Sequence, residues 1–162
     1  MNKDYNSPEE VIARANQEDP TIMYLIVRED LGMSIGKTAA QCAHASQMLT
    51  LKYFTILQSR CSLTKMYSTT DLKTNILVEN VQLKEKMSLF DAWLDSSFRK
   101  VVLKADDKEW EKIKEHFVSD DRVLVIDAGL TELEPGSETV IGLWPMKRSN
   151  VPKIIKRLQV LK

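Results

Sequence analysis

Lys37 is the first residue of the chain whose surroundings could serve chemistry. It lies in GMSIGKTAAQCAHASQM, residues 32–48, which follows the apolar run TIMYLIVR. The apolar run predicts a buried strand, and the Ala-rich segment predicts a helix for which Ser34 is a suitable N-cap. Lys37 then sits near the helix N-terminus, where the helix dipole disfavours a cation. Such a placement is tolerated where an anion or a developing negative charge shares the site.

Asp127 is the second candidate. It ends the apolar run RVLVI, residues 122–126, and is followed by AGLT. In α/β sheets, functional groups gather beyond the carboxyl ends of the strands, and both Lys37 and Asp127 follow such an end. Each has an ordinary alternative interpretation. Lys37 would be a solvated surface charge, and Asp127 a turn residue before Gly129.

The elements that must position these residues follow from hydrophobic spacing. We expect strands near 21–28, 98–105, 122–127 and 138–144. We expect helices near 8–17, 35–58, 75–95 and 106–117, with the polar, loop-like stretch SLTKMYSTTDLKTN over 62–75. The connection TELEPGS is too short for a crossover helix, so the last two strands should be antiparallel. The pattern predicts a three-layer α/β/α sandwich with a four-stranded mixed sheet. Residues 1–20 would form an N-terminal helical arm or tail, and 21–162 the domain.

Composition limits the function classes. The 162 residues carry 23 basic and 23 acidic side chains, so a nucleic-acid ligand would require a local basic patch. Two cysteines, with no CxxC pair, predict neither a disulfide scaffold nor a metal site. The start MNKDYNSPEE lacks the apolar core of a secretory signal, and no run approaches a membrane span. We therefore expect a cytoplasmic protein with no membrane contact and no metal.

One alternative is a P-loop NTPase, because Gly36-Lys37-Thr38 is similar to the end of a Walker A motif and VLVID to a Walker B strand. Walker A requires GxxxxGK[ST], but the residue five before Gly36 is Leu31. Starting from Gly32 instead gives a loop one residue too short. Because this loop must wrap the phosphates with its N–H groups, the spacing disfavours the NTPase.

Two long blocks carry a family resemblance. REDLGMSIGKTAAQCAHA, residues 28–45, is similar to R-x-D-L-x-M-x-x-G-K-x-A-A-Q-C-x-H-A of the type 2 (archaeal and eukaryotic-type) peptidyl-tRNA hydrolases. DAGLTELEPGSETVIGLWP, residues 127–145, resembles the later D-A-G-x-T and P-G-[ST]-x-T-V-x-G-I-x-P of that family, departing mainly at Leu143. The resemblance implies hydrolysis of the ester that joins a peptide to the 3′ end of tRNA. It also implies peptidyl-tRNA as substrate, no cofactor or metal, and a homodimer, since family members commonly dimerise.

The resemblance also implies the functional positions. The catalytic set would be Lys37, Asp127, Thr131 and Thr139. Ester hydrolysis needs a positioned water and a group that stabilises the oxyanion. Asp127 would orient or deprotonate water, Lys37 would bind the oxyanion or a phosphate, and the threonines would bond water or the terminal ribose. These identities leave open which residue activates the water.

Further candidates for substrate binding come from spacing and charge. Gln41 and His44 follow Lys37 on one helix face, and Arg28 precedes the first block. The stretch MKRSNVPKIIKRLQVLK, 146–162, has six basic residues and no acid. It is either a solvated helix face or a contact for tRNA phosphates, made by five side chains: Lys147, Arg148, Lys153, Lys156 and Arg157.

Several departures from the family remove positive charge or add negative charge near the expected site. Ile35 and Leu130 replace common basic residues, and three glutamates add acidity near Asp127: Glu132, Glu134 and Glu138. Trp144 replaces a small residue. An alternative function is therefore a divergent relative that binds tRNA or a protein partner without turnover. The intact candidate catalytic set favours an active hydrolase.

Overall fold

The computed structural model describes residues 7–15, 18–66, 75–96 and 98–162. Five helices occur in this part of the chain: α1 (Pro8–Ala15), α2 (Ile35–Met66), α3 (Asn75–Asp95), α4 (Asp107–His116) and α5 (Lys153–Lys156). Two short 3₁₀ turns cover Glu29–Leu31 and Arg148–Asn150. The strands are β1 (Thr21–Arg28), β2 (Lys100–Ala105), β3 (Arg122–Ile126), β4 (Glu138–Leu143), β5 (Met146–Lys147) and β6 (Gln159–Val160).

The sheet is mixed, as predicted, with β1 at its centre. The strand order is β3-β4-β1-β2-β6, and β5 pairs with the start of β1. β1 and β2 are parallel, while β4 is antiparallel to both β1 and β3. The prediction of four strands was two short. β5 and β6 have only two residues each, and such short strands leave no alternating pattern for the sequence to show.

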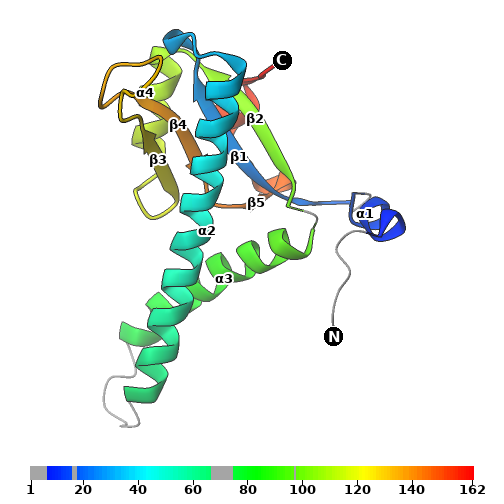
Figure 1. Ribbon diagram of the computed structural model, residues 1–162. Coiled ribbons are helices and arrows are strands. Elements are labelled where there is room, and N and C mark those ends of the chain that lie inside the picture. Colours follow the sequence, from blue (N-terminus) through cyan, green and yellow to red (C-terminus); the bar gives the residue numbers. More distant parts are fainter. Residues whose placement is uncertain (1–6, 16–17, 67–74, 97) are drawn as a thin grey trace.

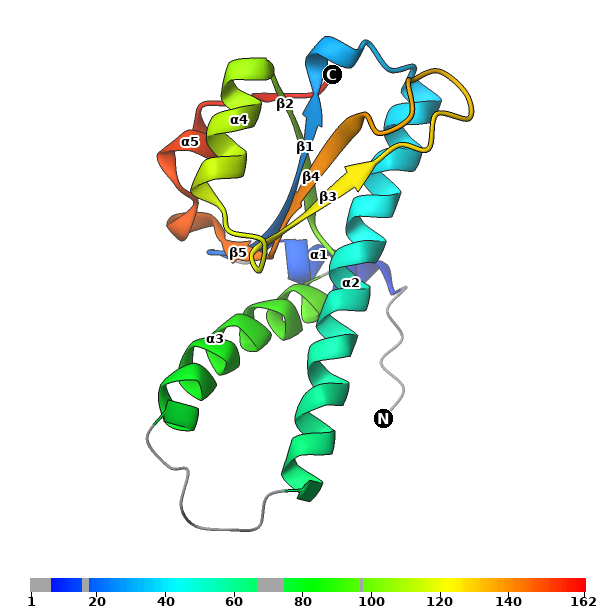
Figure 2. The same ribbon diagram turned by 90° about the vertical axis from the view of Figure 1, so that its left-hand side faces the viewer.

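Helices cover both faces of the sheet, so the three-layer architecture is confirmed (Figure 2). Alternate side chains of β1 enter two separate cores. Ile22, Tyr24 and Ile26 pack on the side of α4 and α5. Met23, Leu25 and Val27 pack on the side of α2 and α3. This burial on both faces explains why TIMYLIVR is continuously apolar. In the described residues, no helix is both long and apolar enough to cross a membrane.

α2 is longer than the sequence predicted and extends well past the sheet (Figure 1). It continues to Met66 instead of ending near residue 58. The helix predicted over 75–95 is confirmed as α3. The polar loop predicted over 62–75 was wrong for 62–66, which belong to α2, and residues 67–74 lie outside the described residues. Polar side chains are compatible with an exposed helix, which is why this stretch gave no helical pattern.

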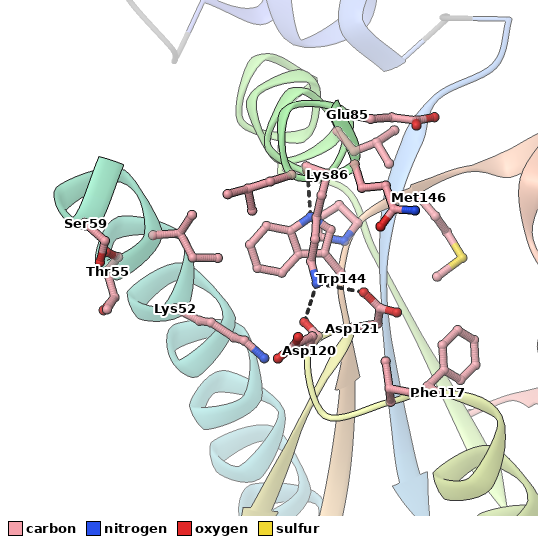
Figure 3. A pocket seen from close by; sticks show the side chains of 16 residues that line it. Lys52, Thr55, Ser59, Glu85, Lys86, Phe117, Asp120, Asp121, Trp144 and Met146 are labelled. Carbon is pink, nitrogen blue, oxygen red and sulfur yellow. Dashed lines mark hydrogen bonds and ion pairs between the residues drawn. The ribbon is translucent and has the colours of Figure 1, made fainter. Parts of the chain in front are cut away.

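An aromatic cluster joins α2 and α3 to the end of the sheet. The rings of Tyr53 and Phe90 stack with centroids 4.4 Å apart, and Phe90 lies 4.8 Å from the Trp144 ring. The Trp144 indole Nε1 donates to the Lys86 carbonyl at 2.8 Å, and the Lys86 ammonium lies 5.0 Å from the indole centroid. Figure 3 shows Trp144 and Lys86 among the residues that line a neighbouring cleft of about 880 Å³. Trp144 therefore lies where α2 and α3 contact the end of the sheet.

We expect Trp144→Ala to lower the free energy of unfolding by about 3–5 kcal/mol, the usual cost of removing a buried aromatic side chain. Trp144 is 4% exposed, whereas Phe54 on α2 is 50% exposed. Phe54→Ala is the matched control and should cost less than about 1 kcal/mol. Urea unfolding measures both. Equal costs for the two variants would mean that Trp144 does not anchor the helices.

Candidate active site

Sheet topology brings Lys37 and Asp127 to one edge. β1 and β3 are each antiparallel to β4, so they run in the same direction and end at the same edge. After β1, Gly32 adopts φ 55° and turns the chain into α2. Ser34 caps this helix as predicted, because its Oγ accepts from the Lys37 N–H at 3.2 Å and its carbonyl accepts from the Thr38 N–H at 2.9 Å.

Lys37 and Asp127 form a nearly buried ion pair. The Lys37 Nζ lies 2.5 Å from the Asp127 Oδ2, and the two side chains are 13% and 5% exposed. The same ammonium donates to the Thr131 Oγ1 at 3.0 Å. The carboxylate of Asp127, which directly follows β3, therefore compensates for the unfavourable position of Lys37 at the N-terminus of α2.

Two further donors fix the Asp127 carboxylate. The Gln41 Nε2 donates to Oδ2 at 2.5 Å, and the Gly129 N–H donates to Oδ1 at 2.8 Å. The Lys37 ammonium and then the Gly129 N–H hold the pKa of Asp127 below its ordinary value of 3.8. Asp127 is thus a carboxylate at neutral pH, held from three sides.

Thr139 supports this arrangement from beneath. Its side chain is 0% exposed. Its Oγ1 lies 3.1 Å from the Gln41 Oε1 and 3.2 Å from the Val125 carbonyl. Gln41 is also buried, at 4% exposure. The chain of contacts runs from the sheet through Thr139 and Gln41 to Asp127, so Gln41 lies behind the carboxylate instead of on an open substrate surface.

A family model described as "Peptidyl-tRNA hydrolase PTH2" matches residues 21–161. The chain belongs to this family.

Three relatives named peptidyl-tRNA hydrolase illustrate the similarity. The protein of Methanopyrus kandleri is 33% identical over 142 residues, which cover 85% of this chain and 96% of the relative. That of Thermoplasma acidophilum is 32% identical over 142 residues, covering 86% and 97%. That of Sulfurisphaera tokodaii is 33% identical over 146 residues, covering 87% and 98%. The resemblance read from the two sequence blocks is confirmed.

The remaining predicted binding residues have surroundings of their own. The Arg28 guanidinium is 2.7 Å from Asp107 and 5.8 Å from the Trp110 ring centroid, so α4 holds it. His44 is exposed on α2. Lys147 pairs with Thr21 at the start of β1, whereas Arg28 ends that strand. The length of β1, about 23 Å at 3.3 Å per residue, separates Lys147 from the site. The segment then runs back along the sheet, because Gln159 and Val160 of β6 pair with Lys104 and Leu103 near the end of β2.

The basic segment is not a single solvated helix face. It forms a 3₁₀ turn, the short α5 and the strand β6. Val151, Ile155 and Leu158 bury their side chains in the core beside α4. The five basic side chains are exposed around this anchored backbone, at Lys147, Arg148, Lys153, Lys156 and Arg157. Asp19, in the segment before β1, accepts from the Ser149 N–H and hydroxyl.

The three nearby glutamates have different surroundings. Glu138 faces α4, where Lys114 lies 2.7 Å from its carboxylate and holds its pKa low. Glu132 accepts two hydrogen bonds from Ser34. The Glu134 side chain is exposed. The contact between Ser34 and Glu132 was not predicted, since nothing in the spacing of the sequence shows that these residues meet. Among the described residues, no cluster of three His, Cys, Asp or Glu side chains could hold a metal ion.

Gly129 is a sensitive point of the site. It has φ 75°, and a Cβ added there would lie 2.5 Å from the Pro135 ring. We expect Gly129→Ala to cost about 2–4 kcal/mol of unfolding free energy, from a left-handed alanine and an overpacked ring. The control is Gly36→Ala, whose Cβ would meet nothing within 4 Å, and which should be neutral or stabilising. Thermal unfolding compares them, and a Gly129→Ala protein as stable as the control would contradict the geometry.

Proposed function

We propose that this PTH2 protein hydrolyses the ester bond between peptide and tRNA in peptidyl-tRNA, releasing free tRNA, and that Lys37 and Asp127 carry the reaction. The observation that supports this assignment most is the nearly buried ion pair between them, with its 2.5 Å contact. The names of the relatives point to the same reaction. The chemistry of each group follows from counting its hydrogen bonds.

Lys37 has a donor available for substrate. An ammonium has three N–H donors, and two of them have acceptors in Asp127 and Thr131. The third can donate to the ester carbonyl oxygen. As water adds, this oxygen gains negative charge, and a fixed ammonium in a nearly buried site stabilises that charge strongly. Lys37 therefore acts as the electrostatic group of the reaction.

Asp127 has one acceptor position available for water. A carboxylate has about four acceptor positions, and three donors reach it from Lys37, Gln41 and Gly129. Because its pKa is held low, Asp127 orients the water by accepting a hydrogen bond and has little tendency to keep a proton. The water oxygen bonds to the ester carbon, the bond to the ribose oxygen breaks, and a proton from water ends on that ribose oxygen.

The non-catalytic alternative rests on the charge around the site. Ile35 and Leu130 are 91% and 87% exposed at the positions where basic residues are common in the family. The two negative charges of Asp127 and Glu132 exceed the single positive charge of Lys37. These features weaken phosphate binding near the ester but leave the reacting groups in place. We therefore favour an active enzyme whose tRNA contacts lie elsewhere.

The catalytic assignment predicts that purified protein releases tRNA from N-blocked aminoacyl-tRNA in the presence of a chelator. Lys37→Ala and Asp127→Asn should each lower kcat on the order of 10²-fold, as loss of an oxyanion donor or a water-orienting group does. Lys112→Ala and Asp120→Asn are matched controls, since both side chains are exposed on other elements. Wild-type rates in both site variants would exclude these roles.

We further propose that tRNA phosphates contact the basic segment 146–162. Lys147 lies about one strand length from the ester site, and the segment then runs back along the sheet to β6, which pairs with β2 near its end. Its cations therefore extend along the sheet toward the ester site. Neutralising Lys153, Lys156 and Arg157 to Gln should raise KM while kcat stays within about twofold. Each lost phosphate contact should flatten the slope of log binding constant against log salt by roughly 0.7–0.9. A triple change of Lys84, Lys108 and Lys112 to Gln, all exposed on α3 and α4, removes the same net charge and is the control. An unchanged KM and slope would move the tRNA to another surface.

Three further expectations stay predictions. A homodimer, common in the family, is checked by the mass of the purified protein in sedimentation. A cytoplasmic location is checked by fractionation. The division into an arm of residues 1–20 and a domain of residues 21–162 is likewise a prediction, and deletion of the arm with retention of folding would support it.

A further inference from the structure

Beyond Asp127, the loop between β3 and β4, residues 127–137, contacts the start of α2 through two further, consecutive side chains. The Thr131 hydroxyl accepts from the Lys37 ammonium at 3.0 Å. The Glu132 Oε2 accepts from the Ser34 N–H at 2.9 Å, and its Oε1 accepts from the Ser34 hydroxyl at 2.5 Å. Leu130, which precedes both, is 87% exposed. In the described part of the chain, these contacts join the exposed part of the loop to α2.

Ser34 links Glu132 to the backbone of Lys37. The Ser34 hydroxyl donates to Glu132 and accepts from the Lys37 N–H at 3.2 Å. Glu132 thereby orients the hydroxyl that caps the helix at Lys37. The two loop residues thus hold Lys37 at both ends, with Thr131 at its ammonium and Glu132, through Ser34, at its amide. A carboxylate at a helix N-terminus is also favourable for the helix dipole.

We propose that Glu132 is a positioning residue for hydrolysis: its two hydrogen bonds to Ser34 hold the β3–β4 loop on α2 and so keep Thr131 against the Lys37 ammonium. This inference rests on the function proposed above. From the sequence, Glu132 was only a negative charge that would weaken tRNA binding near the site. The structure supports a role for it in turnover. Glu132 touches neither the ester nor the Lys37 ammonium and acts through its neighbours.

The charges that face Glu132 make this role costly for tRNA binding. Lys37 attracts the Glu132 carboxylate and Asp127 repels it, and the Ser34 hydrogen bonds are the main cause of its lowered pKa. Glu132 is therefore ionised at neutral pH. Its negative charge lies beside a site for a polyanion and should weaken phosphate binding. The contact between Glu132 and Ser34 therefore raises kcat, while the negative charge of Glu132 raises KM. Removing a surface charge that makes no such contact would change KM alone.

The test compares Glu132→Ala with Glu134→Ala in the N-blocked aminoacyl-tRNA assay. Glu134 is exposed in the same loop, so both variants remove one negative charge from one place. We expect both to lower KM similarly. Only Glu132→Ala should lower kcat, on the order of tenfold, because misplacement of the reacting groups slows turnover. Glu132→Gln should recover part of that loss, since its amide oxygen still accepts one hydrogen bond from Ser34.

A double-mutant cycle tests the partner. Ser34→Gly removes the hydroxyl while keeping a residue that caps helices well. The double variant Ser34→Gly with Glu132→Ala should be little slower than Glu132→Ala alone. Equal kcat values for the Glu132→Ala and Glu134→Ala proteins, or penalties that multiply in the double variant, would overturn the proposal.

Amide hydrogen exchange separates this proposal from the function on which it rests. Exchange at Ser34 and Lys37 should be at least several-fold faster in Glu132→Ala than in Glu134→Ala, with the rest of the protein unchanged. A wild-type protein that releases no tRNA would overturn the proposed function. Hydrogen exchange would then test the contact between Glu132 and Ser34 by itself. Equal exchange at Ser34 and Lys37 in the Glu132→Ala and Glu134→Ala proteins would overturn the positioning role.

Discussion

The ion pair between Lys37 and Asp127 is the interaction on which the site depends. A buried charge is costly unless it is paired and hydrogen-bonded. Here the lysine brings a cation to the positive end of α2, and the aspartate supplies the matching carboxylate from the end of β3. Removing either partner would leave the other uncompensated. The pair therefore requires that α2 and the β3–β4 loop meet, and the rest of the fold makes them meet.

The close approach of α2 to the sheet supports the pair. A Cβ at Gly142 of β4 would lie 3.0 Å from Leu49 and 3.2 Å from Ala45, so the helix packs directly over the glycine. This approach lets Gln41 reach both Thr139 on β4 and Asp127. In the β3–β4 loop, Gly129 adopts a positive φ, which favours glycine, and donates its N–H to the Asp127 carboxylate. Each support holds one oxygen of Asp127 in place.

The sequence predicted the parts of this arrangement that depend on local pattern. β1, α3, the antiparallel pairing of β3 with β4, and the Ser34 cap all follow from periodicity, turn length and capping preference. The motif blocks predicted which side chains gather at the sheet edge. Contacts between residues far apart in the sequence could not be predicted where no motif or spacing links them. Ser34 with Glu132 is one example, and burial of Gln41 behind Asp127 is another. The extension of α2 to Met66 was missed because its polar residues suit a loop equally well.

The most direct test of this account asks whether Lys37 and Asp127 work as one unit. Single-turnover release of tRNA from N-blocked aminoacyl-tRNA would be measured for Lys37→Ala, Asp127→Asn and the double variant. Groups that act together lose most of their effect when either is removed. The account predicts that the double variant is about as slow as the slower single variant. Penalties that multiply in the double variant would show that the two residues act independently, which would contradict the account.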